Sequence, residues 1–227
     1  MQQHVHWQGL PPSARGASVA MGNFDGVHRG HQSVIDLARG PAALGIVTFE
    51  PHPRQFFAPG APAFRLMNAE ARANRLARLG VEHLFQLPFD ATLASLTPEG
   101  FVNQVLSEGL GISHVVVGAD FCFGKGRAGT AQDLATLCEA RGIRTTIAPL
   151  VADNGTEISS TNIRRALTEG RPRDAAAMLG HWHRIEGEVL HGEKRGRELG
   201  YPTANMSVDG LHLPRLGVYA VLVDILT

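Results

Sequence analysis

Short apolar runs alternate with longer amphipathic segments along most of the chain. Apolar runs of this length predict buried strands, and segments with apolar residues at a helical spacing predict helices. Strands that alternate with helices favour an α/β fold, in which right-handed crossovers build a parallel sheet with helices on both faces. The expected strands are 19–21, 44–49, 83–87, 114–117 and 143–148, and the expected helices are 31–39, 69–79, 98–110, 131–141, 163–167 and 172–179.

The pattern changes after Arg184. Glycine-punctuated short strands, expected at 185–190 and 218–223, replace the alternation, and no helical period lies between them. We therefore expect a domain boundary that separates a first domain, residues 1–181, from a second segment, residues 182–227.

Composition argues against several classes of protein. A chain of 227 residues with 44% hydrophobic content can bury a substantial core. Twenty-one lysines and arginines balance twenty-one aspartates and glutamates, so no net charge attracts nucleic acid or an anionic membrane. Cys122 and Cys138 form neither a disulfide framework nor a CxxC metal site, and we find no signal peptide or membrane-spanning run. We expect a cytoplasmic protein without nucleic-acid or membrane partners.

Polar and glycine-rich clusters follow three of the expected strands. They occupy residues 22–31, 50–54 and 118–129. Because ligands of open parallel sheets bind beyond the carboxyl ends of the strands, the fold predicts a site at these clusters.

His28 and His31 stand three residues apart where a helix is expected to begin. Both rings can therefore project from one face, and Gly30 between them lets a ligand approach the backbone. Together with the free amides of a helix N-terminus, they form a cradle for phosphate. Imidazoles and amides aimed at a departing pyrophosphate would stabilise the transition state of adenylyl transfer.

Other interpretations of the histidine pair stay open at this point. Eleven histidines in the chain make a chance pair common. A two-histidine zinc site would need a third ligand, which no Cys or His supplies at a typical spacing. Residues 22–26 do not follow the GxxxxGK[ST] pattern, which argues against a P-loop kinase.

A second anion site is expected where residues 159–162 precede the helix at 163–167. Hydroxyls and amides at a helix N-terminus, together with the guanidinium of Arg164, suit a phosphate group. The serines of this segment can equally serve as ordinary N-caps.

Four segments, in sequence order, resemble motifs of the prokaryotic bifunctional riboflavin kinase/FMN adenylyltransferases, the FAD synthetases. The resemblance implies an α/β fold with a Rossmann-like HxGH nucleotidyltransferase domain. The segments resemble the HxGH signature region at 22–31, the flavin-side motif at 49–54, the central motif at 117–124 with Arg127 and Gly129, and the ISSTxIR phosphate-binding motif at 158–164.

The resemblance implies transfer of AMP from ATP to FMN, which yields FAD and pyrophosphate, with Mg²⁺ carried by the nucleotide and its protein ligands unassigned. His28 and His31 would face the triphosphate, while Asn23 and Asp25 would orient the loop and the substrate phosphate. ATP and phosphate binding would involve Gly22, Phe24, Gly30, Ser159, Ser160, Thr161 and Arg164.

Flavin binding is implied for a proline-containing loop after a strand, at His52, Pro53 and Arg54. It is also implied for Asp120, which could instead contact the adenosine. An exposed loop with a solvated arginine would show the same residues at 52–54.

Residues 187–192 and 196–205 resemble the start of the riboflavin kinase module of the same family, whose PTAN segment carries metal and ATP phosphates and maps onto Thr203 and Asn205. After this region the family continues with much of a barrel and an acidic general base, whereas the present sequence stops at Thr227. We therefore expect an incomplete β-barrel segment, with an unpaired apolar strand at 218–226. The expected small-molecule partners are ATP and FMN, with riboflavin phosphorylated only by a full-length form.

Three alternatives stay open from the sequence. An HxGH nucleotidyltransferase could act on another phosphorylated acceptor, such as pantetheine phosphate or nicotinamide mononucleotide, although residues 49–54 and the kinase-like segment favour flavin. A flavin- or nucleotide-binding protein without catalysis would carry the same phosphate motifs. A nucleic-acid-binding module is disfavoured by the zero net charge, and Lys194, Arg195 and Arg197 are better explained as a loop near ATP.

Overall fold

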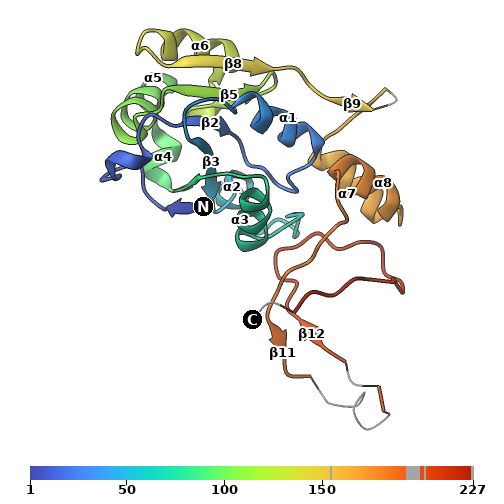
Figure 1. Cartoon of the computed structure of the whole chain (residues 1–227). Helices are drawn as coiled ribbons and strands as arrows, with labels where there is room; N and C mark the ends of the chain where they lie inside the picture. Colours follow the sequence, from blue (N-terminus) through green and yellow to red (C-terminus); the bar gives the residue numbers. More distant parts are fainter. Residues whose placement is uncertain (154, 193–199, 202, 226–227) are drawn as a thin grey trace.

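Six parallel strands form the central sheet of the protein (Figure 1). The computed structural model describes residues 1–153, 155–192, 200–201 and 203–225. The strand order is β1-β4-β3-β2-β5-β8, and every neighbouring pair is parallel. The predicted α/β class with a parallel sheet is therefore confirmed. The strands are β1 (Gln2–His4), β2 (Ser18–Met21), β3 (Leu44–Glu50), β4 (His83–Pro88), β5 (His114–Gly118) and β8 (Arg144–Ala148).

Successive residues of each strand enter two separate cores, one on each face of the sheet. On β2, Val19 and Met21 join one hydrophobic cluster while Ala20 joins the other. This alternation follows from the two-residue period of a strand. Helices α1 (Arg29–Leu37) and α3 (Ala69–Arg78) cover the face of Ala20, and the opposite face is covered by η2 (Phe101–Leu110) and α6 (Ala131–Glu139).

Shorter elements connect and extend this framework. A third apolar cluster joins the last two helices of the domain to Leu66. No helix among the described residues is both long and apolar enough to cross a membrane. The remaining elements are η1 (Pro12–Ala14), α2 (Pro53–Phe57), α4 (Ala91–Ser95), α5 (Pro98–Gly100), β6 (Cys122–Phe123), η3 (Lys125–Arg127), β7 (Gly129–Thr130), β9 (Ala152–Asp153), β10 (Thr156–Glu157), α7 (Ser160–Thr168), α8 (Pro172–Leu179), β11 (Val189–Leu190) and β12 (Asn205–Met206).

The predicted strands and helices of the first 180 residues are found within a few residues of their expected bounds. The helix expected at 98–110 begins with α5 and continues as a π-helix in η2. The short elements β1 and α2 were not predicted. β1 is a three-residue edge strand beside β4, too short to give a pattern.

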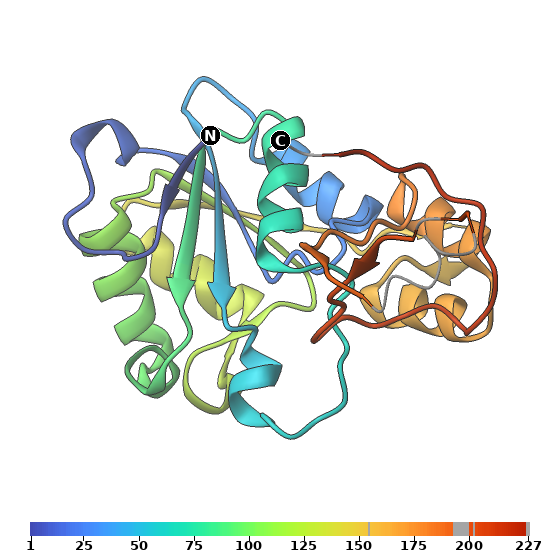
Figure 2. The ribbon, with the colours of Figure 1, turned by 90° about the horizontal axis from the view of Figure 1, so that it is seen from below.

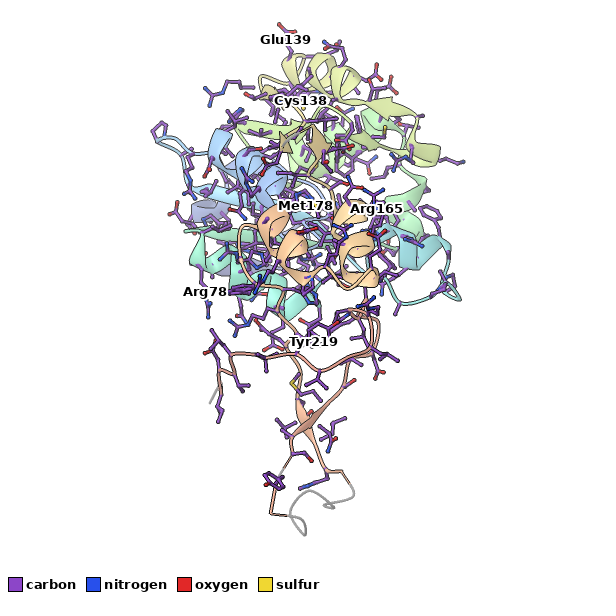
Figure 3. All side chains as sticks on the ribbon, turned by 90° about the vertical axis from the view of Figure 1, so that its right-hand side faces the viewer. Arg78, Cys138, Glu139, Arg165, Met178 and Tyr219 are labelled. Carbon is purple, nitrogen blue, oxygen red and sulfur yellow. The ribbon has the colours of Figure 1, made fainter. Side chains whose placement is uncertain are left out.

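The prediction of a strand at 218–223 was wrong, and of the strand expected at 185–190 only β11 forms. A strand needs a partner for its backbone groups, and the described residues near 218–223 offer none. Val218 and Leu222 are almost fully exposed. Figure 3 shows this segment, with Tyr219, beneath the body of the domain.

No closed barrel is formed by the described part of this segment, where β11 and β12 make a two-stranded antiparallel pair. The motif residues 196–199 and 202 lie outside the described residues. So do Lys194, Arg195 and Arg197, for which the sequence suggested a loop near ATP.

The segment after residue 180 contacts the first domain, and Figure 2 shows it next to α7 and α8. The N-cap of α3, Asn68, donates through Nδ2 to the carbonyl oxygen of Glu186 at 3.0 Å, and Asn74 Nδ2 donates to the Glu186 carboxylate at 2.9 Å. Farther on, the chain forms a parallel bridge between Arg65 and Leu211. The two halves of the chain are thus joined by specific contacts.

The burial of two phenylalanines predicts how much each contributes to the free energy of unfolding. Phe85 on β4 has no exposed surface, so Phe85→Ala should lower the free energy of unfolding by about 3–5 kcal/mol through lost contacts and a cavity. Phe57 is 67% exposed, and Phe57→Ala should cost less than about 1 kcal/mol. Urea unfolding of both variants measures this, and equal losses would contradict the assignment of the core.

Candidate functional site

The three polar clusters noted in the sequence lie at one edge of the sheet. They follow β3, β2 and β5, which are adjacent parallel strands, so their carboxyl ends point the same way. The order of strands reverses at β2, with β3 and β4 on one side and β5 and β8 on the other. Such a reversal opens a crevice in which open α/β sheets bind their ligands.

The two histidines of the first cluster are stacked. His28 is the N-cap of α1, and its Nδ1 accepts a hydrogen bond from the backbone N–H of His31 at 3.3 Å. The ring centroids are 3.6 Å apart, with 18° between the planes. The buried ring of Phe24 lies 5.1 Å from that of His31, so Phe24 supports the pair from the core and can offer a ligand only its backbone.

Both imidazoles are neutral near pH 7. Burial, helped by the positive charge of Arg164, lowers the pKa of His28 to about 4. Burial, followed by the neighbouring His28, lowers the pKa of His31 well below 6.5. Because Nδ1 of His28 accepts a hydrogen bond, its proton lies on Nε2. The pair thus supplies uncharged N–H donors rather than two cations.

A close approach explains why glycine stands between the histidines. A Cβ on Gly30 would lie 3.1 Å from the ring of His28 and 3.3 Å from the carbonyl oxygen of Ile158. Ile158 precedes Ser159, the N-cap of α7, so the N-termini of α1 and α7 converge at this point. Two converging helix N-termini concentrate free N–H groups and partial positive charge, which suits a polyphosphate.

The serine hydroxyls of the second anion segment are engaged within the protein. Ser159 Oγ accepts from the backbone N–H of Asn162 at 3.3 Å, as an N-cap does. Ser160 Oγ donates to the carbonyl oxygen of Asp25 at 2.8 Å, while Thr161 is exposed. The amides of the first turn, Thr161 and the O–H group of Ser159 are the groups that this segment can offer to phosphate.

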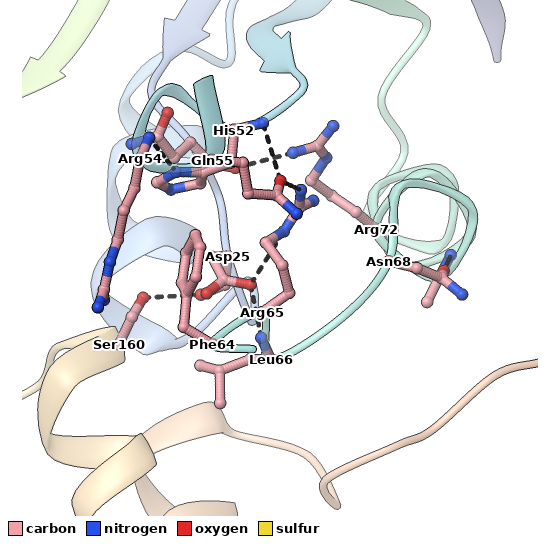
Figure 4. Close-up of polar contacts among 12 residues, drawn as sticks. Asp25, His52, Arg54, Gln55, Phe64, Arg65, Leu66, Asn68, Arg72 and Ser160 are labelled. Carbon is pink, nitrogen blue, oxygen red and sulfur yellow. Dashed lines mark hydrogen bonds and ion pairs between the residues drawn. The ribbon is translucent and has the colours of Figure 1, made fainter. Parts of the chain in front are cut away.

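Asp25 joins three separate parts of the chain (Figure 4). Its carboxylate is 2% exposed and accepts from the backbone N–H of Leu66 at 2.8 Å and from Arg164 Nη2 at 2.5 Å. Arg65 Nε lies 3.8 Å from the same carboxylate. Asp25 therefore fixes the glycine loop to α7, whereas Asn23 bonds through its carbonyl oxygen to Thr48 and Arg72.

Sequence reasoning missed the charged residues next to this carboxylate. Glu50 pairs with Arg65 at 3.1 Å and with Arg72 at 2.9 Å, and Gln55 accepts from Arg65 at 3.0 Å. Burial, followed by repulsion from Arg65, lowers the pKa of Arg72 to about 10, so its guanidinium remains charged. One signal was available for Arg72, because it lies four residues before Leu76 on the buried face of α3.

The predicted flavin-side residues converge on Phe64. His52 caps α2, whose first residue is Pro53, and its ring lies edge-on to Phe64 with centroids 4.9 Å apart. The guanidinium carbons of Arg54 and Arg164 lie 4.5 and 5.3 Å from the centroid of Phe64. Burial, followed by the charges of the surrounding arginines, lowers the pKa of His52 to about 3. This loop is therefore positive although its histidine is neutral.

An open pocket of about 360 Å³ lies beside the same loop. Gln55 and Phe64 contribute to its wall from one half of the chain, and Gly210 contributes from the other. The pocket is thus bounded by both halves.

Asp120 is not brought together with His52 and Arg54. It lies in the exposed turn after β5, and β2 separates that strand from β3. At the usual spacing of neighbouring strands, the ends of β3 and β5 are about 10 Å apart. Asp120 Oδ1 lies 2.9 Å from the position that a Cβ on Gly118 would take, so this carboxylate lies over the end of β5.

Thr203 and Asn205 are exposed and lie in the second segment, where Asn205 belongs to β12. Figure 1 places β12 well away from the carboxyl edge of the sheet. Among the described residues, no group of three or more His, Cys, Asp or Glu side chains could hold a metal ion.

A parallel α/β sheet with stacked histidines and two helix N-termini at its switch point is consistent with a nucleotidyltransferase of the HxGH type. A family model described as FAD synthetase matches residues 10–162, and one described as riboflavin kinase matches residues 179–227. The chain belongs to the FAD synthetase family.

Individual relatives agree with this assignment. The chain is 41% identical to the bifunctional riboflavin kinase/FMN adenylyltransferase of Pseudomonas fluorescens, over 95% of this chain and 71% of that protein. It is 36% identical to the FAD synthetase of Listeria monocytogenes, over 91% of this chain and 81% of that protein. A crystal structure described as a macrolide-efflux protein from Streptococcus pneumoniae shares 33% identity and a TM-score of 0.79, over 96% of this chain and 72% of that one.

The neutral histidines predict how stability depends on pH. The unfolded chain takes up a proton on His28 near pH 6.5, whereas the folded protein does so only near pH 4. The free energy of unfolding should therefore fall as the pH drops from 7 to 5, by about 2 kcal/mol for His28 alone. Urea unfolding at several pH values measures the slope. His28→Gln should flatten it and His6→Gln, at an exposed position, should not; equal slopes in both variants would contradict the assignment.

Proposed function

We propose that this chain transfers the adenylyl group of ATP to the phosphate of FMN, giving FAD and pyrophosphate. The observation that carries the proposal is the convergence of His28, His31 and the N-termini of α1 and α7 at one edge of the sheet, in a chain of the FAD synthetase family. An oxygen of the FMN phosphate attacks the α-phosphorus, and the bond to the bridging oxygen of the β-phosphate breaks. That oxygen leaves with the electron pair, so no net proton transfer is required.

Most residues of the site act by position and electrostatics in this reaction. His28 and His31 donate N–H groups to the departing pyrophosphate, and the backbone at Gly22 and Gly30 lets the phosphates approach. The first turn of α7 and Arg164 hold phosphate oxygens from the opposite side.

The flavin end of the reaction is assigned to the positive loop after β3. Arg54 supplies charge for the FMN phosphate, while His52 and Pro53 shape the loop next to Phe64. Asp120, in the turn after β5, is assigned to the adenosine of ATP or to the flavin of FMN.

ATP enters this reaction as its Mg²⁺ complex. The metal ion is assigned to the nucleotide, and its protein ligands are left unassigned. Two free cysteines, Cys122 and Cys138, support a reducing compartment, and we infer a cytoplasmic enzyme. We place the boundary between its two parts after residue 181.

His31→Ala should lower the turnover of FMN to FAD by about 100-fold, because a donor to the leaving group is lost. The control is His6→Ala, an exposed histidine outside the site. FAD and pyrophosphate are quantified with FMN, pantetheine phosphate and nicotinamide mononucleotide as acceptors. An unchanged rate for His31→Ala would remove this histidine from the mechanism, and preference for another acceptor would contradict the proposed substrate.

A protein of these 227 residues should not phosphorylate riboflavin. Apolar side chains such as Val218, Leu222 and Ile225 are largely exposed, and the described part of the kinase-like segment closes no barrel around a substrate. Incubation with riboflavin and MgATP, followed by chromatography, measures any FMN formed. FMN above the level of an enzyme-free control would contradict this expectation.

A further inference from the structure

The kinase-like half of the chain holds the backbone of Arg65 from both sides. Arg65 N–H donates to the carbonyl oxygen of Gly210 at 3.2 Å, and the N–H of His212 donates to the carbonyl oxygen of Arg65 at 2.8 Å. Leu211 between them is 7% exposed. We call residues 208–212 the strap. Farther along the same segment Val218 and Leu222 are almost fully exposed, whereas this short stretch packs on the first domain.

The strap also reaches α7. His212 Nε2 lies 3.1 Å from the carbonyl oxygen of Arg164 and 3.0 Å from Thr168 Oγ1. Three residues later, the N–H of Arg215 donates to the carbonyl oxygen of Leu167 at 2.9 Å. The strap therefore touches both elements that supply partners to the buried carboxylate of Asp25.

The contacts continue from the strap into the site. Arg65 pairs with Glu50, and the next residue, Leu66, donates its N–H to Asp25. Asp25 in turn holds Arg164 at 2.5 Å, and Arg164 Nε donates to the carbonyl oxygen of Phe64 at 2.6 Å. A shift of residues 64–66 would displace the guanidinium that is assigned to the phosphates.

We propose that the strap is a positioning element for adenylyl transfer, in which Leu211 and His212 fix Arg65 and Arg164 without touching a substrate. This inference rests on the proposed function of the site. The strap belongs to the region that the riboflavin kinase model matches. The proposal gives this region a role in the adenylyl transfer of the first domain. Loss of the strap should weaken ATP binding more than it slows the chemical step, because the phosphate-binding guanidinium is displaced.

The first test compares three variants by steady-state kinetics. His212→Pro removes both the backbone donor to Arg65 and the imidazole, whereas His212→Ala removes the imidazole alone. The matched control is Glu186→Ala, which breaks the carboxylate contact with Asn74 on α3, another contact between the two halves. We expect KM for ATP to rise about tenfold in His212→Pro, less in His212→Ala, and not in Glu186→Ala. Equal KM values in all three would overturn the proposal.

A second measurement does not depend on activity. Hydrogen exchange of the Leu66 amide, which donates to Asp25, should be about tenfold faster in His212→Pro than in the unmodified chain and unchanged in Glu186→Ala. Unchanged exchange in His212→Pro would overturn the proposal. If the unmodified chain made no FAD, the proposed function would fail, and this measurement alone would decide on the strap.

A double-mutant cycle tests whether the strap acts by positioning the guanidinium of Arg164. If it does, His212→Pro combined with Arg164→Gln should raise KM for ATP no more than Arg164→Gln alone. Additive effects would overturn the proposed route. Circular dichroism checks that each variant is folded. If His212→Pro is not, KM for ATP in His212→Ala compared with Glu186→Ala decides, and equal values would overturn the proposal.

Discussion

A buried carboxylate is the constraint on which the site depends. Asp25 is nearly inaccessible to water, so its charge has to be matched by Arg164, Arg65 and the N–H of Leu66. These partners come from α7 and from an extended segment far from the glycine loop in sequence. Removing one partner of such a pair leaves an uncompensated charge at a cost of several kcal/mol. The loop, the anion segment and the flavin-side loop are therefore held in one arrangement by the need to neutralise a single group.

Local patterns predicted most of the framework. The strand at 44–49 and the helix at 172–179 were found because a short apolar run, a proline at the first helical position and Gly180 at the end are signals within a few residues. The histidine pair could be placed for the same reason, since its spacing and the helix start are adjacent in sequence. The prediction of a strand at 218–223 was wrong because a strand needs a hydrogen-bonded partner, and a hydrophobic run alone does not supply one.

The charged residues around Asp25 could not be read from the sequence in the same way. Arg65 stands in a segment without periodicity, and its partners Gln55, Glu50 and Asp25 lie 10, 15 and 40 residues away along the chain. Nothing in the order of residues distinguishes it from a solvated arginine. Arg72 differed, because an arginine on the apolar face of a helix is itself unusual. The hydrogen bonds of Ser159 and Ser160 likewise became visible only in the structure, since an N-cap and a phosphate ligand have the same sequence.

The uncharged state of the stacked histidines has a consequence for selectivity. A pair of buried imidazolium ions would attract any small anion, and inorganic phosphate is abundant in cells. Neutral rings contribute only directional hydrogen bonds, so a single phosphate group gains little from them. A triphosphate can engage the rings and both helix N-termini at once, and each further contact is made at a high effective concentration. For the function proposed above, such a site would favour an extended polyanion over the free phosphate that competes for it.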